Sequence, residues 1–255
     1  MLRAEGLALA YPGRLLLEEL TLEFHPGQMW AVLGRNGSGK STLLRALSGL
    51  HRAHRGAVRI EGRPLGALPR RDVALRIGVL LQEETREFWG SVRDYVLLGR
   101  YPHAHGLFGW SAQDEAVAQS EMEALHLTGF AARSYATLSG GERQRARAAA
   151  LFAQRAPVVL LDEPLQHLDL AHQVAVLERL RKEARDRGTI VILVLHDLLF
   201  ASRYCDHFLL LRGDGRSSHG AGADILSADR LSELYGAALD AVEVRGETLL
   251  LPRRS

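Results

Sequence analysis

Cysteine and long apolar runs are scarce in this chain of 255 residues. The single cysteine, Cys205, cannot form an internal disulfide, which fits a reducing compartment. The apolar run at 190–195 stops at His196 and Asp197, whereas a membrane-spanning helix needs about 18–20 apolar residues. The first residues, Met-Leu-Arg-Ala-Glu-Gly, lack the apolar core of a signal peptide. We therefore expect a soluble protein, for which any membrane role depends on a partner.

An excess of charge of one sign is also missing. Lysine and arginine number 32 against 30 aspartates and glutamates, and this balance gives no reason to expect direct binding of nucleic acid. Hydrophobic residues make up 47% of the chain, enough for a substantial core. The length fits one large α/β domain, or one domain with an inserted lobe. We therefore treat residues 1–255 as a single domain.

Short apolar segments alternate with helical patterns along most of the chain. Predicted strands are 7–9, 20–24, 29–33, 58–60, 77–81, 158–161 and 189–195; predicted helices are 42–50, 112–125, 141–154, 170–187 and 228–235. Because helices separate the apolar strands, we expect a mostly parallel sheet. The helical stretch 83–150 is predicted to be a lobe inserted into a core formed by 1–82 and 151–255. The tail from residue 211 is expected to hold short strands and one helix.

A glycine-rich loop is the clearest chemical signal. Residues 34–41 read Gly-Arg-Asn-Gly-Ser-Gly-Lys-Ser, with a buried strand predicted before them and a helix after them, as a phosphate loop requires. Glycines let backbone N–H groups turn toward one anion, and the helix adds its positive N-terminal end. Lys40 would then reach the β- and γ-phosphates of ATP, and the Ser41 hydroxyl would ligate Mg²⁺. The predicted nucleotide-binding residues are Gly34, Arg35, Asn36, Gly37, Ser38, Gly39, Lys40, Ser41 and Thr42.

Polar residues end three of the predicted core strands. Asp162 would hold Mg²⁺, and Glu163 would orient and deprotonate the attacking water. His196 would donate a hydrogen bond to charge that develops near the γ-phosphate. Gln82 would touch the metal or the water with its amide. Alone, the two acids and Gln82 are common as solvated side chains, and a histidine in the place of His196 is more often structural, but beside a phosphate loop they predict ATP hydrolysis.

A second anion site is predicted at the start of the helix near residue 141. Ser139 has the place of an N-cap, and Gly140 and Gly141 leave the helix N-terminus bare. Lys40 already belongs to a complete phosphate loop, so one nucleotide would have two anion sites in one chain. Two copies packed head-to-tail resolve this, because each nucleotide then lies between the loop of one copy and the Ser139 helix of the other. The sequence thus predicts a homodimer.

The order of these motifs resembles the nucleotide-binding subunit of ABC transporters over nearly the whole chain. The phosphate loop resembles the Walker A motif, residues 138–144 the signature motif, and residues 158–163 the Walker B motif. Gln82 resembles the glutamine of the Q-loop, and His196 resembles the switch histidine. The implied fold is an α/β P-loop NTPase with a mostly parallel core sheet, an N-terminal antiparallel β subdomain and an inserted helical lobe.

The resemblance also implies further contacts and partners. Asp169 resembles the D-loop aspartate near the dimer interface, and Tyr11 resembles the aromatic residue that stacks on adenine. Transmembrane permease subunits would dock on the lobe near Gln82, and a periplasmic or surface binding protein would deliver the cargo to them. The chain would be peripheral, on the cytoplasmic face of the inner membrane.

Finer similarities point to uptake. Residues 97–103, 167–173 and 196–205 resemble importers of iron–siderophore, haem and cobalamin. Three residues near the D-loop depart from the usual pattern and bear on communication within the dimer: Leu165, Gln166 and His167. The alternatives are the ATPase of an exporter, a soluble ABC-type ATPase in translation or DNA repair, and a small-molecule kinase. The kinase alternative leaves residues 138–144 unexplained.

Overall fold

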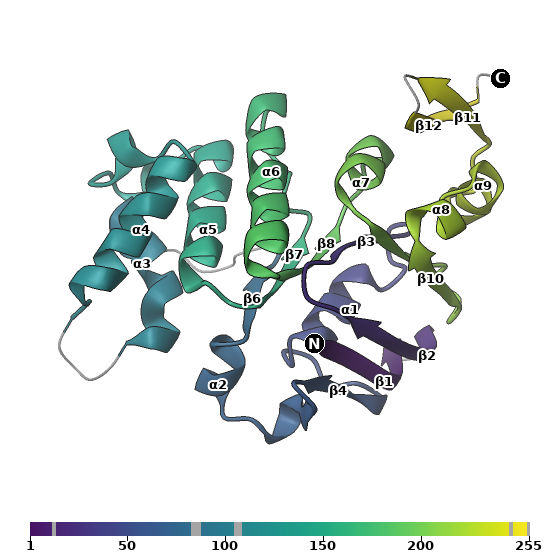
Figure 1. The fold of residues 1–255 in the computed structure, drawn as a ribbon, viewed down its shortest axis with the longest axis horizontal. Helices are drawn as coiled ribbons and strands as arrows, with labels where there is room; N and C mark the ends of the chain where they lie inside the picture. Colours follow the sequence, from purple (N-terminus) through teal and green to yellow (C-terminus); the bar gives the residue numbers. More distant parts are fainter. Residues whose placement is uncertain (12–13, 83–87, 105–108, 245–246, 254–255) are drawn as a thin grey trace.

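A computed structural model describes residues 1–11, 14–82, 88–104, 109–244 and 247–253 (Figure 1). Its central sheet has the strand order β10-β9-β3-β8-β7-β6, parallel from β9 to β6, with β10 antiparallel at one edge. The bounds are β3 Met29–Leu33, β6 Ile77–Leu80, β7 Val158–Asp162, β8 Ile190–Val194, β9 His207–Leu211 and β10 Ser217–Ala221. Every residue of β3, β7 and β8 is buried, which explains their continuous apolar sequences.

An antiparallel sheet of order β2-β1-β4-β5 lies on one side of the central sheet, with α1 packed against both. Leu7 of β1, Leu43 of α1 and Val32 of β3 belong to one buried cluster. This cluster fixes the start of α1 beside the carboxyl end of β3. The bounds are β1 Leu2–Tyr11, β2 Arg14–Phe24, β4 Arg55–Ile60, β5 Arg63–Pro64 and α1 Lys40–Leu47.

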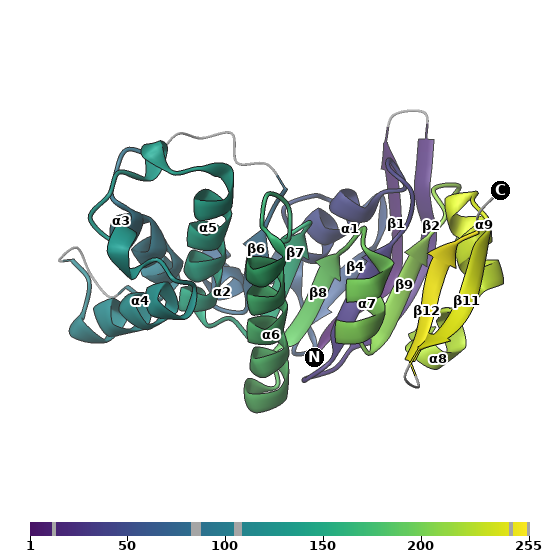
Figure 2. The ribbon, with the colours of Figure 1, turned by 90° about the horizontal axis from the view of Figure 1, so that it is seen from above.

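Helices α5, α6 and α7 cover the other face of the central sheet (Figure 1). Beyond the β6 edge, α3 and α4 pack on α5, whereas α8, α9 and the β11-β12 hairpin lie at the opposite end (Figure 2). The bounds are α2 Arg70–Ala74, α3 Val92–Leu97, α4 Ala112–Ala124, α5 Gly140–Gln154, α6 Leu170–Arg187, α7 Leu198–Tyr204, α8 Gly222–Ile225, α9 Ala228–Tyr235, β11 Leu239–Val244 and β12 Glu247–Pro252.

The predicted fold class is confirmed, and the main errors concern element boundaries. Strand β1 is ten residues long, not the predicted 7–9, because pairing with β2 and β4 supplies hydrogen bonds along its whole length. Helix α1 begins at Lys40 instead of residue 42 and ends before Gly49, which has φ 72°. The tail holds a second helix, α8, which is too short to show a periodic pattern. The division into a core and a lobe at 83–150 stays a prediction.

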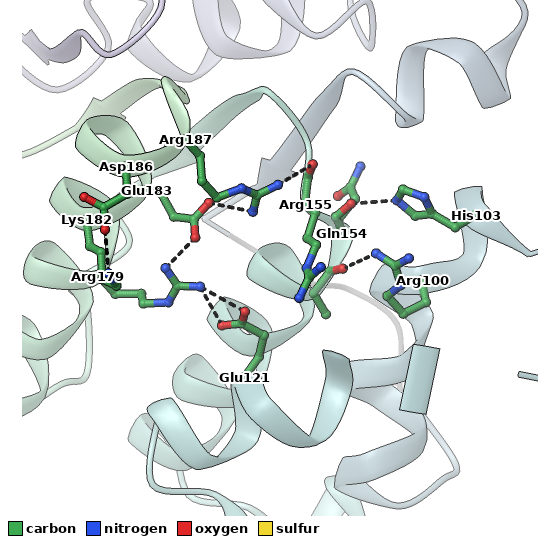
Figure 3. A network of polar contacts seen from close by, with 11 residues as sticks. Arg100, His103, Glu121, Gln154, Arg155, Arg179, Lys182, Glu183, Asp186 and Arg187 are labelled. Atoms are coloured by element: carbon green, nitrogen blue, oxygen red, sulfur yellow. Dashed lines mark hydrogen bonds and ion pairs between the residues drawn. The ribbon is translucent and has the colours of Figure 1, made fainter. Parts of the chain in front are cut away.

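Charged side chains join α4 to α6 (Figure 3). Nη2 of Arg179 donates to both carboxylate oxygens of Glu121 at 2.9 and 3.1 Å, and Nη1 donates to Glu183. Nη1 of Arg187 donates to the second oxygen of Glu183 at 2.8 Å. The Glu121 and Glu183 side chains are only 5% and 9% exposed, so their charges depend on these arginines.

Side chains from separate elements also cover the last carbonyl groups of α5, which lack partners within the helix (Figure 3). Arg100 donates to the carbonyl of Ala153 at 2.8 Å, and Nε2 of His103 donates to that of Gln154 at 2.8 Å. Arg187 reaches the carbonyl of Arg155 at 3.4 Å. Helix α5 is thus anchored at its C-terminal end, opposite the end that begins after Ser139.

We expect Arg179→Met to lower the free energy of unfolding by about 3–5 kcal/mol, because it leaves the buried Glu121 carboxylate without its cation. The matched control is Arg93→Met, which removes the partner of exposed Glu115 on the same helix α4. Exposed pairs contribute about 0–1 kcal/mol, so the control should unfold nearly as the parent does. Urea denaturation followed by circular dichroism measures both, and equal losses would contradict a structural role for the buried pair.

Candidate ATP site

The carboxyl ends of neighbouring parallel strands bring the predicted site residues together. Gly34 follows β3, His196 lies just after β8, Glu163 follows β7, and Gln82 lies just after β6. Ligands of open α/β sheets bind outside this edge. A pocket of about 830 Å³ opens here. It is lined by Arg14, Leu16, Asn36, Gly37, Gly39, Lys40, Ser41, Thr42, Gln82, Glu163, Gln166 and His196.

The glycines of the loop are required by close backbone approach. A Cβ atom at Gly34 would lie 2.4 Å from the carbonyl oxygen of Leu211 on β9, so no larger residue fits there. Gly39 is the N-cap of α1 with φ 100°, a left-handed conformation that favours glycine. Because this cap has no side chain, it leaves the first N–H groups of α1 open to an anion.

Lys40 is 6% exposed and is held inside the loop. Its Nζ donates to the carbonyl oxygens of Gly34 at 2.8 Å and Arg35 at 3.1 Å. Burial lowers the pKa of Lys40, while the carboxylates of Glu163 and Asp162 raise it. A phosphate in the pocket would offset the cost of burying this ammonium group.

Asp162 has the character of a metal ligand. It is 1% exposed, and its Oδ1 has no hydrogen-bond partner among the described residues. Burial raises the pKa of Asp162, and a hydrogen bond from the Ser41 hydroxyl lowers it. A buried carboxylate oxygen next to a hydroxyl suits Mg²⁺, which prefers oxygen ligands. Gln82, the third predicted ligand, is exposed and lines the same pocket.

Glu163 and His196 are in direct contact. Nε2 of His196 donates to Oε1 of Glu163 at 2.7 Å, although 33 residues separate them. Nε2 of Gln166 donates to the other carboxylate oxygen of Glu163. The Glu163 side chain is 12% exposed and lies in the wall of the pocket. The arrangement can hold a carboxylate beside bound phosphate as a proton acceptor.

Ser139 caps α5 as predicted. Its hydroxyl accepts from the Glu142 N–H at 3.3 Å, and Glu142 accepts from the Ser139 N–H at 2.7 Å, a complete capping box. A Cβ atom at Gly141 would lie 2.9 Å from the carbonyl oxygen of His167, so the turn before α6 packs on these glycines. Ser139, Gly140 and Gly141 are not among the described residues that line the pocket.

Asp169 and Tyr11 complete the predicted set. Asp169 caps α6 and accepts from the N–H of His172 at 2.9 Å. It too is outside the group of described residues that line the pocket. Tyr11 ends β1, and its side chain lies outside the described part of the structure. One copy therefore brings together the phosphate loop and the acids but not Ser139 or Asp169.

Three residues of the pocket wall were not predicted. Arg14 donates to the carbonyl of Gly213 at 3.2 Å, and Leu16 packs beneath Gly39. Both lie at the start of β2, where no motif distinguishes them from other strand residues. Gln166 stood out in the sequence as a departure from the pattern that the resemblance implies, but its position in the sequence did not predict its hydrogen bond to Glu163.

A phosphate loop between β3 and α1, with acids at the end of β7, is the arrangement of P-loop NTPases. The chain belongs to the ABC transporter family, the model of which matches residues 17–166. This membership confirms the predicted family and ATPase activity, and it contradicts the small-molecule kinase alternative. Within the described ranges, no helix has both the length and the apolar character needed to cross a bilayer.

Similar proteins cover nearly the whole chain. It is 40% identical to the hemin import ATP-binding protein HmuV of Rhodococcus jostii, over 99% of this chain and 86% of that protein. It is 39% identical to the ferric enterobactin transport ATP-binding protein FepC of Escherichia coli, over 98% and 93%.

The solved structures that resemble this chain are also ABC transporters. An inward-facing ABC transporter described as metal-chelate type matches with a TM-score of 0.84 and 30% identity, over 99% of this chain and 97% of that one. A bacterial ABC transporter cassette solved as a dimer matches with a TM-score of 0.76 and 25% identity, over 86% and 98%.

Proposed function

We propose that this chain is the ATP-hydrolysing subunit of an importer that takes up a metal chelate, haem or iron–siderophore, or cobalamin. The observation that carries the ATPase part is the contact between Glu163 and His196 beside a complete phosphate loop. The cargo class is supported by relatives that import hemin and ferric enterobactin. We place the chain at the cytoplasmic face of the inner membrane, peripheral through its permease.

The proposed chemistry assigns a role to each group in the pocket. The loop N–H groups and Lys40 hold the β- and γ-phosphates of ATP. Ser41, Asp162 and Gln82 would hold Mg²⁺, which neutralises phosphate charge when bound. Water attacks the γ-phosphorus, the bond to the β–γ bridging oxygen breaks, and the proton of the water passes to Glu163. The His196 bond keeps the Glu163 carboxylate oriented.

A second copy would complete each site. Ser139 and Asp169 cap helices whose N-terminal ends lie outside their own ATP pocket in the described structure. A head-to-tail homodimer would bring them to the nucleotide of the partner, with the Ser139 helix facing the phosphates. The similar cassette that was solved as a dimer supports the dimeric state. The dimer would close when ATP binds and open after hydrolysis, and this motion would drive transport. Tyr11 would stack on the adenine of the nucleotide.

The permease would dock on exposed apolar side chains of the segment that follows Gln82 in the sequence. Trp89, Leu98 and Tyr101 are 87%, 44% and 72% exposed. Leu98 lines a groove of about 330 Å³ together with Leu81 and Arg147, and Arg147 donates to the Leu81 carbonyl. Gln82 directly follows Leu81 in the sequence and lines the ATP pocket. Movement of a permease segment docked in this groove would therefore displace a residue of the pocket wall.

We expect Tyr101→Glu to abolish co-purification with the co-expressed permease, because it places a charge in the apolar docking surface. ATP affinity of the isolated chain, measured by calorimetry, should stay within about 2-fold, since Tyr101 does not line the pocket. The control is Val242→Glu on the distant β11, where Val242 is 40% exposed.

Uptake of haem, ferric siderophore and cobalamin into vesicles that carry the complex then identifies the cargo. No uptake of any of the three would reject the importer in favour of an exporter or a non-transport ATPase.

A further inference from the structure

Gln166 departs from the family pattern and lies against the proposed base. Its Nε2 donates to Oε2 of Glu163, while Nε2 of His196 donates to Oε1 at 2.7 Å. Each oxygen of the carboxylate therefore has one fixed donor. A carboxylate oxygen can accept more than one hydrogen bond, so each oxygen keeps capacity for the proton of a water.

The backbone turn after β7 brings Gln166 to this position. Glu163 has φ 53°, an uncommon conformation for a residue other than glycine. The chain then folds back, and the N–H of Gln166 donates to the carbonyl of Glu163 at 3.3 Å. Gln144 of α5 holds the turn by donating from Nε2 to the Pro164 carbonyl at 2.8 Å. The turn thus places the amide of Gln166 against the carboxylate of Glu163.

Gln166 and Glu163 both line a second, smaller cavity of about 210 Å³ next to the ATP pocket. Apolar side chains, among them Leu165, Val194 and Phe200, form part of its wall. Without the amide of Gln166, His196 alone would hold the carboxylate, and this cavity would give the side chain room to turn away from the phosphate loop. The hydrogen bond from Gln166 would therefore keep the carboxylate in the orientation seen in the structure.

We infer that Gln166 is a positioning residue that keeps the Glu163 carboxylate directed at the water beside the γ-phosphate. The inference rests on the proposed role of Glu163. It predicts a larger effect on turnover than on ATP binding, because Gln166 lines the pocket beside the base and lies outside the phosphate loop. It also predicts that the residue at 166 must donate a hydrogen bond.

Gln166→Leu should lower kcat about 10-fold, with KM and the ATP affinity from calorimetry within about 2-fold. Gln166→Glu should lower kcat further at pH 8, because two carboxylates then repel each other. Its kcat, relative to the parent, should rise as the pH falls, since the introduced carboxyl donates to Glu163 once protonated. The parent profile is the reference because Lys40, Asp162 and His196 also face Glu163. If Gln166 only stabilised the fold, kcat of Gln166→Glu relative to the parent would not rise as the pH falls.

Gln173→Leu is the matched control. Gln173 lines the same small cavity and donates to the Leu165 carbonyl at 3.3 Å, and no contact with Glu163 is seen among the described residues. Its kcat should stay within about 2-fold of the parent. Parent-like kcat in Gln166→Leu, or an equal loss in Gln173→Leu, overturns the inference. Glu163→Gln in the same assay separates the causes: if it stays active, the proposed base is wrong, and if it alone is inactive, only the role of Gln166 fails.

Discussion

Replacing Glu163 with glutamine lowers ATP turnover by about 10²–10⁴-fold and leaves ATP affinity almost unchanged, which is the expected result for loss of a general base. Glutamine keeps the shape of the side chain and can still accept the hydrogen bond that His196 donates. It cannot take the proton of the attacking water. Phosphate release measures the turnover, and calorimetry with Mg·ATP measures the binding.

The same variant should also accumulate as a dimer in the presence of ATP. If ATP joins two copies and hydrolysis separates them, a variant that binds without hydrolysing stays joined. Light scattering should then show twice the monomer mass with ATP but the monomer mass with ADP. A Glu163→Gln protein that remains monomeric with ATP and hydrolyses it at the parent rate would reject both the base and the shared site.

Local spacing made the phosphate loop and the acids predictable. Eight consecutive residues encode the loop, and Asp162 and Glu163 directly follow an apolar strand, so sequence neighbours are also neighbours in the site. Ser139 was predictable as an N-cap for the same reason, since its capping partner Glu142 is three residues away. Interactions within one turn leave a readable pattern.

Contacts that depend on how the chain folds back were not predictable. The hydrogen bond from Gln166 to Glu163 needs a left-handed backbone conformation at Glu163. A glutamate at that position does not predict this conformation, whereas a glycine would have favoured it. The pair of Glu121 and Arg179 joins residues 58 apart in the sequence, and many other charged pairs would have fitted the composition equally well. That ion pair needs α4 and α6 to lie close enough for Arg179 to reach Glu121, which periodicity does not specify.

A mixture of two inactive variants should recover activity if each ATP site is shared between copies. In Ser139→Arg the phosphate loop is intact but the opposing helix end is blocked, and in Lys40→Ala the loop is defective but the helix end is intact. We expect each variant alone to lose at least about 10²-fold in turnover. The mixed dimer has one site made from the intact loop of one chain and the intact Ser139 of the other. With random pairing, the mixture should regain up to about a quarter of the parent activity.

The complementary mixture tests the same geometry from the opposite direction. A chain that carries both Ser139→Arg and Lys40→Ala, paired with the parent chain, has one defect in each shared site, so the mixed dimer should be inactive. If Ser139 instead served the phosphate loop of its own chain, the single variants would not rescue each other, and the parent half of the second mixed dimer would keep working. Because the two geometries give opposite results in both mixed dimers, phosphate release from the two mixtures decides whether the Ser139 helix acts across the dimer.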